Sequence, residues 1–98
     1  MSNEEVKNKE WRYFGRDPGT GKFCEIYRCP ANGKSVLQQK LEDVQLLLKD
    51  GNWRSNMKNE LVDASIKGWF DESSDELSEE EAMDYFQKWQ AGIWPGRS

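Results

Sequence analysis

The chain has 98 residues, a formal net charge of −4 and 36% hydrophobic residues, which fits one small domain with a modest core. Charged residues make up 33% and the mean hydropathy is −0.99, yet 12% aromatic residues, with five tryptophans, exceed what a disordered chain carries. No apolar run approaches the roughly 18 residues of a membrane span, and the start lacks the apolar stretch of a signal peptide. We predict a single domain over 1–98 that is cytoplasmic and makes no membrane contact.

Histidine is absent, and the only cysteines are Cys24 and Cys29, which limits the chemistry available to the chain. Structural zinc sites generally need four Cys or His ligands, so we expect no metal. Every histidine-dependent triad or general base is excluded as well, and only carboxylates, lysines, tyrosines or a thiol are left for catalysis. We therefore predict that the protein is not an enzyme, that it binds no cofactor and that both thiols are reduced.

An antiparallel β-hairpin is predicted over 10–29, after a disordered leader at 1–9. Two runs rich in aromatic and β-branched residues, 11–16 and 22–28, flank the sequence Asp-Pro-Gly-Thr-Gly. Proline presets φ for a turn and the two glycines permit positive φ, so this segment is typical of a hairpin loop. Because the apolar residues do not alternate cleanly, we expect one face to meet a helix and the other to meet solvent or a partner.

The hairpin loop continues into Pro-Gly-Thr-Gly-Lys at 18–22, which resembles the end of a Walker A phosphate-binding loop. The first glycine of that motif would fall at Arg16, and Phe23 stands where the motif has Ser or Thr. A strand follows instead of the helix whose N-terminus would bind phosphate. We interpret the segment as a hairpin turn.

The first of three predicted helices covers 35–50. Ser35 and Gln38 have the spacing of a capping box, and Gly51 is a natural stop. Four apolar residues recur at helical spacing: Leu37, Leu41, Val44 and Leu48.

The second predicted helix, 55–67, carries two apolar stripes more than a right angle apart. One stripe contains Met57, Leu61 and Ala64, and the other contains Val62, Ile66 and Trp69. Such a helix either lies between two layers or buries its second side in a homodimer, and we favour the first arrangement.

The third predicted helix, 78–91, follows an acidic loop at 71–76. Ser78 is the expected N-cap and Glu81 its capping-box partner. An apolar stripe follows at helical spacing: Ala82, Tyr85, Phe86, Trp89 and Ile93. Together these elements predict an α+β fold, in which the hairpin, with or without a third strand, packs against two or three helices.

Charge is divided along the chain: residues 1–58 carry +3 and residues 59–98 carry −7. By elimination we expect a non-enzymatic protein-binding module, an adaptor, inhibitor or accessory subunit, which is a monomer or homodimer. Its two candidate surfaces are an aromatic, basic hairpin and an acidic helical face that could meet a basic protein. The candidate partner-binding residues are Trp11, Arg12, Tyr13, Arg16, Tyr27, Arg28, Trp53 and Trp94, and the candidate acidic face is Glu79, Glu80 and Asp84.

Two alternatives stay open in this interpretation. Trp53 and Trp94 lie outside the regular apolar stripes and are either core or interface residues, and for Trp94 we favour docking onto the domain's own core. The aromatic and arginine residues of the hairpin also resemble the composition of single-stranded nucleic-acid binders, although the acidic second half would repel a polyanion. We therefore rank nucleic acid below protein as the partner.

Overall fold

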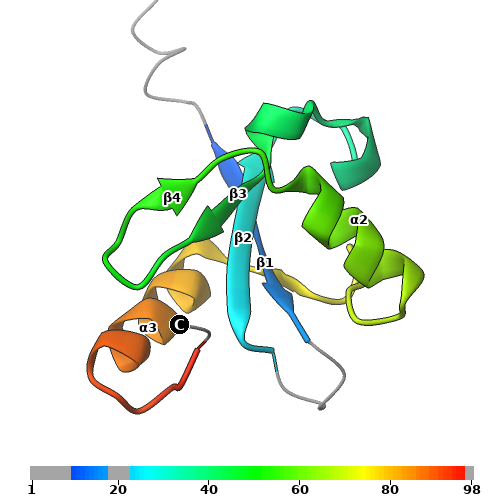
Figure 1. The fold of residues 1–98 in the computed structure, drawn as a ribbon. Helices are drawn as coiled ribbons and strands as arrows, with labels where there is room; N and C mark the ends of the chain where they lie inside the picture. The colour runs from blue at the N-terminus through cyan, green and yellow to red at the C-terminus, as the bar shows by residue number, and fades with distance from the viewer. Residues whose placement is uncertain (1–9, 18–22, 97–98) are drawn as a thin grey trace, which may run out of the picture.

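The computed structural model describes residues 10–17 and 23–96; the predicted leader at 1–9 and the turn at 18–22 lie outside the described residues. An antiparallel sheet with strand order β4-β3-β2-β1-β5 forms the centre of the fold. Two α-helices cover opposite faces of this sheet (Figure 1). The predicted α+β class is thus confirmed, although the sheet has more strands than the two or three expected.

The predicted hairpin forms the middle of the sheet. Strand β1 (Trp11–Arg16) pairs with β2 (Glu25–Pro30) along its whole length, with Phe14 opposite Tyr27. Because side chains alternate along each strand, these two rings face one side and Tyr13 and Ile26 face the other. Both sides are buried under helices, so the expectation that one face would meet solvent or a partner is wrong for most of the hairpin.

The predicted helix over 35–50 is wrong. The segment contains two single-turn 3-10 helices, η1 (Val36–Gln38) and η2 (Leu41–Asp43), and then strand β3 (Gln45–Leu47). The Ser35 N–H does donate to the Gln38 side chain at 3.0 Å, as a capping box requires, but the helix ends after one turn.

The buried side chain of Gln39 explains why the first turn stops. Its amide nitrogen donates to the carbonyl oxygens of Pro30 and Lys34 and to the Asn32 side chain, at 3.4, 3.1 and 2.9 Å. These bonds hold the chain extended at Gln39, where ψ is 158°. Tertiary hydrogen bonds therefore override the local helical pattern.

The residues after η2 form a second hairpin at the edge of the sheet. Strand β4 (Trp53–Arg54) pairs with β3, with Leu47 opposite Trp53. Gly51, which the sequence pattern marks as a helix stop, lies in the connecting turn with φ at 92°. Only glycine adopts this backbone conformation readily, so its role is to permit the turn.

Helix α2 (Lys58–Ile66) lies within the predicted range 55–67 and covers one face of the sheet. Leu61 and Ala64 of the first stripe are buried in a cluster with Phe14 and Tyr27. Ile66 of the second stripe is 79% exposed, so in the described structure the helix does not lie between two layers.

Helix α3 (Glu79–Gln90) covers the opposite face, within the predicted range 78–91. Ala82 and Trp89 are buried against Tyr13, Ile26 and Leu47. Ile93, the last member of the predicted stripe, is 73% exposed because the helix has ended before it. Strand β5 (Glu76–Leu77) precedes the helix and pairs with β1, so the predicted acidic loop ends in a strand.

The predicted capping box of α3 is confirmed. The Ser78 hydroxyl accepts from the Glu81 N–H at 3.0 Å, and the Glu81 carboxylate accepts from the Ser78 N–H at 2.8 Å. We expect Ser78→Ala to lower the free energy of unfolding by about 1 kcal/mol, measured by urea denaturation. Ser65→Ala, at an exposed serine within α2, is the control and should cause no loss. Equal effects of the two variants would contradict a stabilising cap.

Candidate functional site

The predicted partner-binding residues of the hairpin do not form one surface. Alternation along β1 and β2 turns Arg12, Arg16 and Tyr27 towards the α2 side, and Trp11, Tyr13 and Arg28 towards the α3 side. The rings of Tyr13 and Tyr27 are buried in the two opposite core clusters. The aromatic, basic hairpin is therefore divided between two environments.

Arg12 is held by two carboxylates of the acidic segment before α3. Its guanidinium contacts Glu72 at 2.7 Å and Glu76 at 3.0 Å. The hydrogen bond to Glu76, more than any other contact, raises the pKa of Arg12. The positive charge of Arg12 is thus neutralised within the domain.

Arg16 forms a buried ion pair with Glu25 on the neighbouring strand. The Arg16 Nε donates to the Glu25 carboxylate, and the Tyr27 hydroxyl donates to the same carboxylate oxygen at 2.9 Å. Burial, the largest single effect, opposes the charge of Arg16, but the hydrogen bond and charge of Glu25 together with Tyr27 outweigh it and raise the pKa of Arg16. Burial, followed by the nearby charge of Glu25, also raises the pKa of Tyr27. This network connects β1 to β2 and pairs both buried charges within the domain.

On the α3 side, Trp11, Arg28 and Trp53 form what we call the tryptophan–arginine stack. The Arg28 guanidinium carbon lies 3.9 Å from the ring centre of Trp11 and 4.1 Å from that of Trp53. The Arg28 Nε donates to the Gln45 side chain at 2.7 Å. Each member of the stack is half-buried, so part of each side chain reaches solvent. Strands β1, β2 and β4 each supply one residue.

Trp94 packs onto the domain's own core, which is the favoured of its two alternatives. Its ring lies 5.4 Å from that of Phe23, 5.5 Å from Tyr85 and 5.7 Å from Trp89. The Trp94 indole N–H donates to the Phe23 carbonyl at 3.3 Å. Trp94 therefore anchors the segment after α3 to Phe23, just before β2, and does not belong to the tryptophan–arginine stack.

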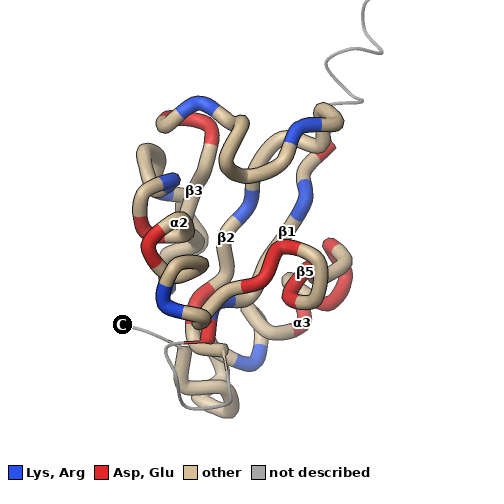
Figure 2. Tube along the Cα trace, turned by 90° about the vertical axis from the view of Figure 1, so that its right-hand side faces the viewer, with Lys and Arg blue, Asp and Glu red and all other residues tan. Residues whose placement is uncertain are grey.

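The predicted acidic face lies on the exposed side of α3. Glu79, Glu80 and Asp84 are all exposed, and Asp84 pairs with Lys88 at 3.0 Å. Figure 2 shows that acidic residues of β5, the turn before it and the start of α3 follow one side of the molecule. Burial, and then the charge of Glu79, raises the pKa of Tyr13, whose ring lies 6.1 Å from that of Trp53. The acidic start of α3 and the stack therefore adjoin at Tyr13.

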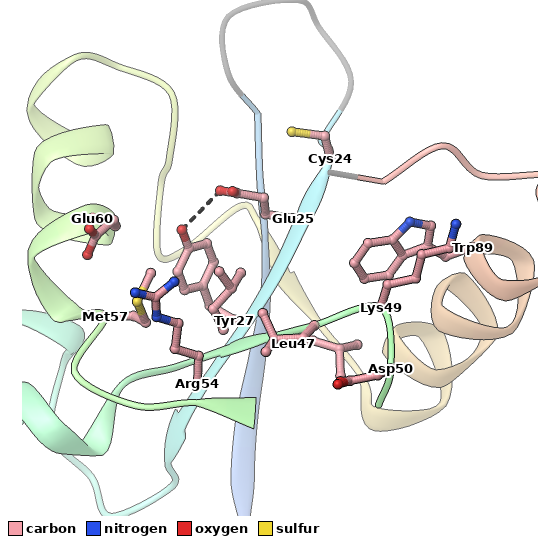
Figure 3. A pocket seen from close by; sticks show the side chains of 12 residues that line it. Cys24, Glu25, Tyr27, Leu47, Lys49, Asp50, Arg54, Met57, Glu60 and Trp89 are labelled. Carbon is pink, nitrogen blue, oxygen red and sulfur yellow. Dashed lines mark hydrogen bonds between the residues drawn. The ribbon is translucent and has the colours of Figure 1, made fainter. Parts of the chain in front are cut away.

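A cavity of about 640 Å³ lies beside β2, and the sequence pattern does not reveal it. Strand β3 pairs with β2 at Tyr27 and Arg28, and the cavity opens where that pairing ends, beside Glu25. Figure 3 shows Met57 and Glu60 on one side of β2 and Trp89 on the other. Five separate segments contribute to its lining, so no local motif could have indicated it.

The most buried charged side chain of the cavity is engaged in hydrogen bonds within the domain. This side chain is Glu25, which accepts hydrogen bonds from Arg16 and Tyr27. Of the two cysteines, Cys24 lines the cavity and Cys29 is buried in the core, where burial raises the thiol pKa to about 11. Such a thiol is protonated and inert at neutral pH.

Among residues 10–17 and 23–96, no group of three or more His, Cys, Asp or Glu side chains is arranged to hold a metal ion. No helix in the same part of the chain is long and apolar enough to cross a membrane. Comparison with known proteins gives no match: no family model fits the chain, and no curated protein and no solved structure is significantly similar to it.

Proposed function

We propose that this protein is a non-enzymatic binding module that acts on another protein in the cytoplasm. The observation that carries the proposal is the half-buried tryptophan–arginine stack of Trp11, Arg28 and Trp53. Tryptophan and arginine dominate the binding energy of protein interfaces, because they combine large contact area with directed hydrogen bonds. A stack of rigid rings also loses little conformational freedom when a partner binds.

The acidic start of α3 supplies the second part of the proposed surface. Glu79 and Glu80 are exposed at the positive end of the helix dipole, and the charge of Glu79 acts on Tyr13, whose ring lies 6.1 Å from that of Trp53. Acidic groups beside an aromatic centre favour a partner whose rim is basic, since complementary charge speeds association and excludes wrong partners. This arrangement supports the predicted basic protein as the partner.

The alternative, single-stranded nucleic acid, has less support than the composition of the hairpin suggested. Arg12 and Arg16 are engaged by carboxylates, and the rings of Tyr13 and Tyr27 are buried, so these residues cannot offer cations or stacking surfaces. Trp11 and Trp53 are the observation in its favour. If it were correct, single strands would bind with strong salt dependence, and Arg28→Ala would weaken that binding.

The test is affinity capture from the native host with matched variants. We expect Trp53→Ala to reduce retention of the main bound protein at least 30-fold, which corresponds to a hot-spot loss of about 2 kcal/mol. Ile66→Ala, at an exposed residue of α2 on the other face, should leave retention unchanged. Circular dichroism and thermal unfolding of both variants show whether the fold is intact. A folded Trp53→Ala protein that retains every partner would contradict the proposal.

A further inference from the structure

Arg28 differs from the other described arginines of the hairpin because no carboxylate pairs with it in the described structure. Arg12 and Arg16 form ion pairs with carboxylates, whereas the hydrogen bonds of Arg28 go to the neutral side chains of Gln45 and Tyr13. Among residues 10–17 and 23–96, Arg28 forms no ion pair. Arg28 is therefore a cation without a counter-ion in the described structure.

The environment of Arg28 removes water from this cation. The indoles of Trp11 and Trp53 both lie against the guanidinium, whose central carbon is at about van der Waals distance from each ring centre. Burial accordingly lowers the pKa of Arg28, with the hydrogen bond to Tyr13 opposing it. A partly desolvated guanidinium attracts an anion more strongly than a fully hydrated one does, because the local dielectric constant is lower.

The geometry selects the shape of the anion. Nε is bonded to Gln45 and Tyr13 takes a further hydrogen bond, so the remaining N–H groups of the terminal Nη atoms are left to bind a ligand. A guanidinium edge matches the two oxygens of a carboxylate with two parallel hydrogen bonds. The negative charge of Glu79, which acts on Tyr13 beside the stack, disfavours a dianion such as phosphate more than a singly charged group.

We infer that the tryptophan–arginine stack is a carboxylate-binding site that receives an acidic side chain or the C-terminal carboxylate of the partner protein. The carboxylate binds the outer edge of Arg28, and the exposed parts of Trp11 and Trp53 contact the apolar neighbours of that group. This inference rests on the proposed protein-binding function and adds the chemical group that Arg28 recognises. In this arrangement the basic rim of the partner faces Glu79 and Glu80, while a carboxylate of the partner binds Arg28 at the centre of the interface.

The test is an NMR titration of the full-length ¹⁵N-labelled protein with small probes. N-acetyl-leucine represents a C-terminal carboxylate, N-acetyl-aspartic acid amide represents a side-chain carboxylate, and N-acetyl-leucinamide is the neutral control. We expect at least one carboxylate probe to shift the Arg28 Nε–H and the indole signals of Trp11 and Trp53 in a saturable manner below about 100 mM. The probe that binds more tightly identifies the source of the carboxylate.

Variants of Arg28 complete the test. Arg28→Gln should weaken binding of the carboxylate probe at least tenfold, and Arg28→Lys should also weaken it, because lysine keeps the charge but lacks the planar edge. Arg54→Gln, at an exposed arginine of β4, is the matched control and should bind as the wild type does. Arg28→Lys also serves as the test if Arg28→Gln fails to fold.

Three results would overturn the inference: no shift with either carboxylate, equal shifts with the neutral amide, or tighter binding of inorganic phosphate. Its failure is distinguishable from failure of the proposed function. If Trp53→Ala loses the protein partner but no carboxylate binds, the stack contacts the partner by other means. If carboxylates bind but Trp53→Ala retains every partner, the anion site exists and the proposed interface is wrong.

Discussion

Glu25→Ala is expected to lower the free energy of unfolding by about 3–5 kcal/mol, because it leaves the Arg16 guanidinium buried without its counter-ion. The Tyr27 hydroxyl loses its acceptor in the same variant, and an unpaired buried donor adds to the cost. Urea denaturation at neutral pH measures the loss. For a domain of this size such a loss is a large part of the total stability.

The control for this prediction is an ion pair of the same kind on the surface. Asp63→Ala breaks the exposed pair between Asp63 and Lys67 on α2 and should change stability by less than about 1 kcal/mol. The double variant Arg16→Met with Glu25→Leu removes both buried charges and should recover much of the loss. If Glu25→Ala costs no more than Asp63→Ala, the pair between Arg16 and Glu25 is hydrated and the described burial is wrong.

Elements whose signals are local could be predicted from the sequence. The ends of α3 are determined by the Ser78 cap and by the turn after Gln90, and both lie within a few residues of the helix. The hairpin of β1 and β2 could be predicted because two runs of strand-forming residues flank a turn-forming segment. Neither element depends on a distant residue to begin or end.

The segment 35–50 could not be predicted correctly because its leucine spacing fits two structures. Leu37 and Leu41 match a helical stripe but are exposed, at 65% and 43%, while Val36 and Val44 are buried. The segment's structure depends on the bonds of Gln39 to the chain after β2, which no local pattern encodes. A short apolar run such as Leu46–Leu48 is compatible with either a strand or a helix until its neighbours are known.

The individual residues of the candidate site could be named from the sequence, but which of them lie together on one surface could not. Trp11 and Arg28 could be assigned to one face by strand alternation, but Trp53 joins them only because β4 pairs with β3, and the predicted helix over 35–50 excluded β3. The pairing of Arg12 with Glu72 and Glu76 joins residues about sixty positions apart. Long-range pairing of this kind decides which charges are available to a partner.

Leu61→Ala is expected to lower the free energy of unfolding by about 2–5 kcal/mol, since the Leu61 side chain is 0% exposed in the cluster beneath α2. The loss has two parts: the free energy gained when the removed atoms leave water on folding is forfeited, and a cavity remains in the cluster that contains Tyr27. Ile66→Ala removes a similar apolar volume from the same helix at a residue that is 79% exposed, and should change stability by less than about 0.5 kcal/mol.

This pair of variants also tests the homodimer alternative for the second stripe of α2, since the alternative of a helix between two layers does not hold in the described structure. If the stripe is free, the small effect of Ile66→Ala is the same at all protein concentrations. If a homodimer covers it, Ile66→Ala costs as much as a core substitution at high concentration and less on dilution, because the lost burial then belongs to the association step. Since the described structure leaves Ile66 exposed, we expect no dependence on concentration, and sedimentation analysis of wild type and variant provides the independent measurement.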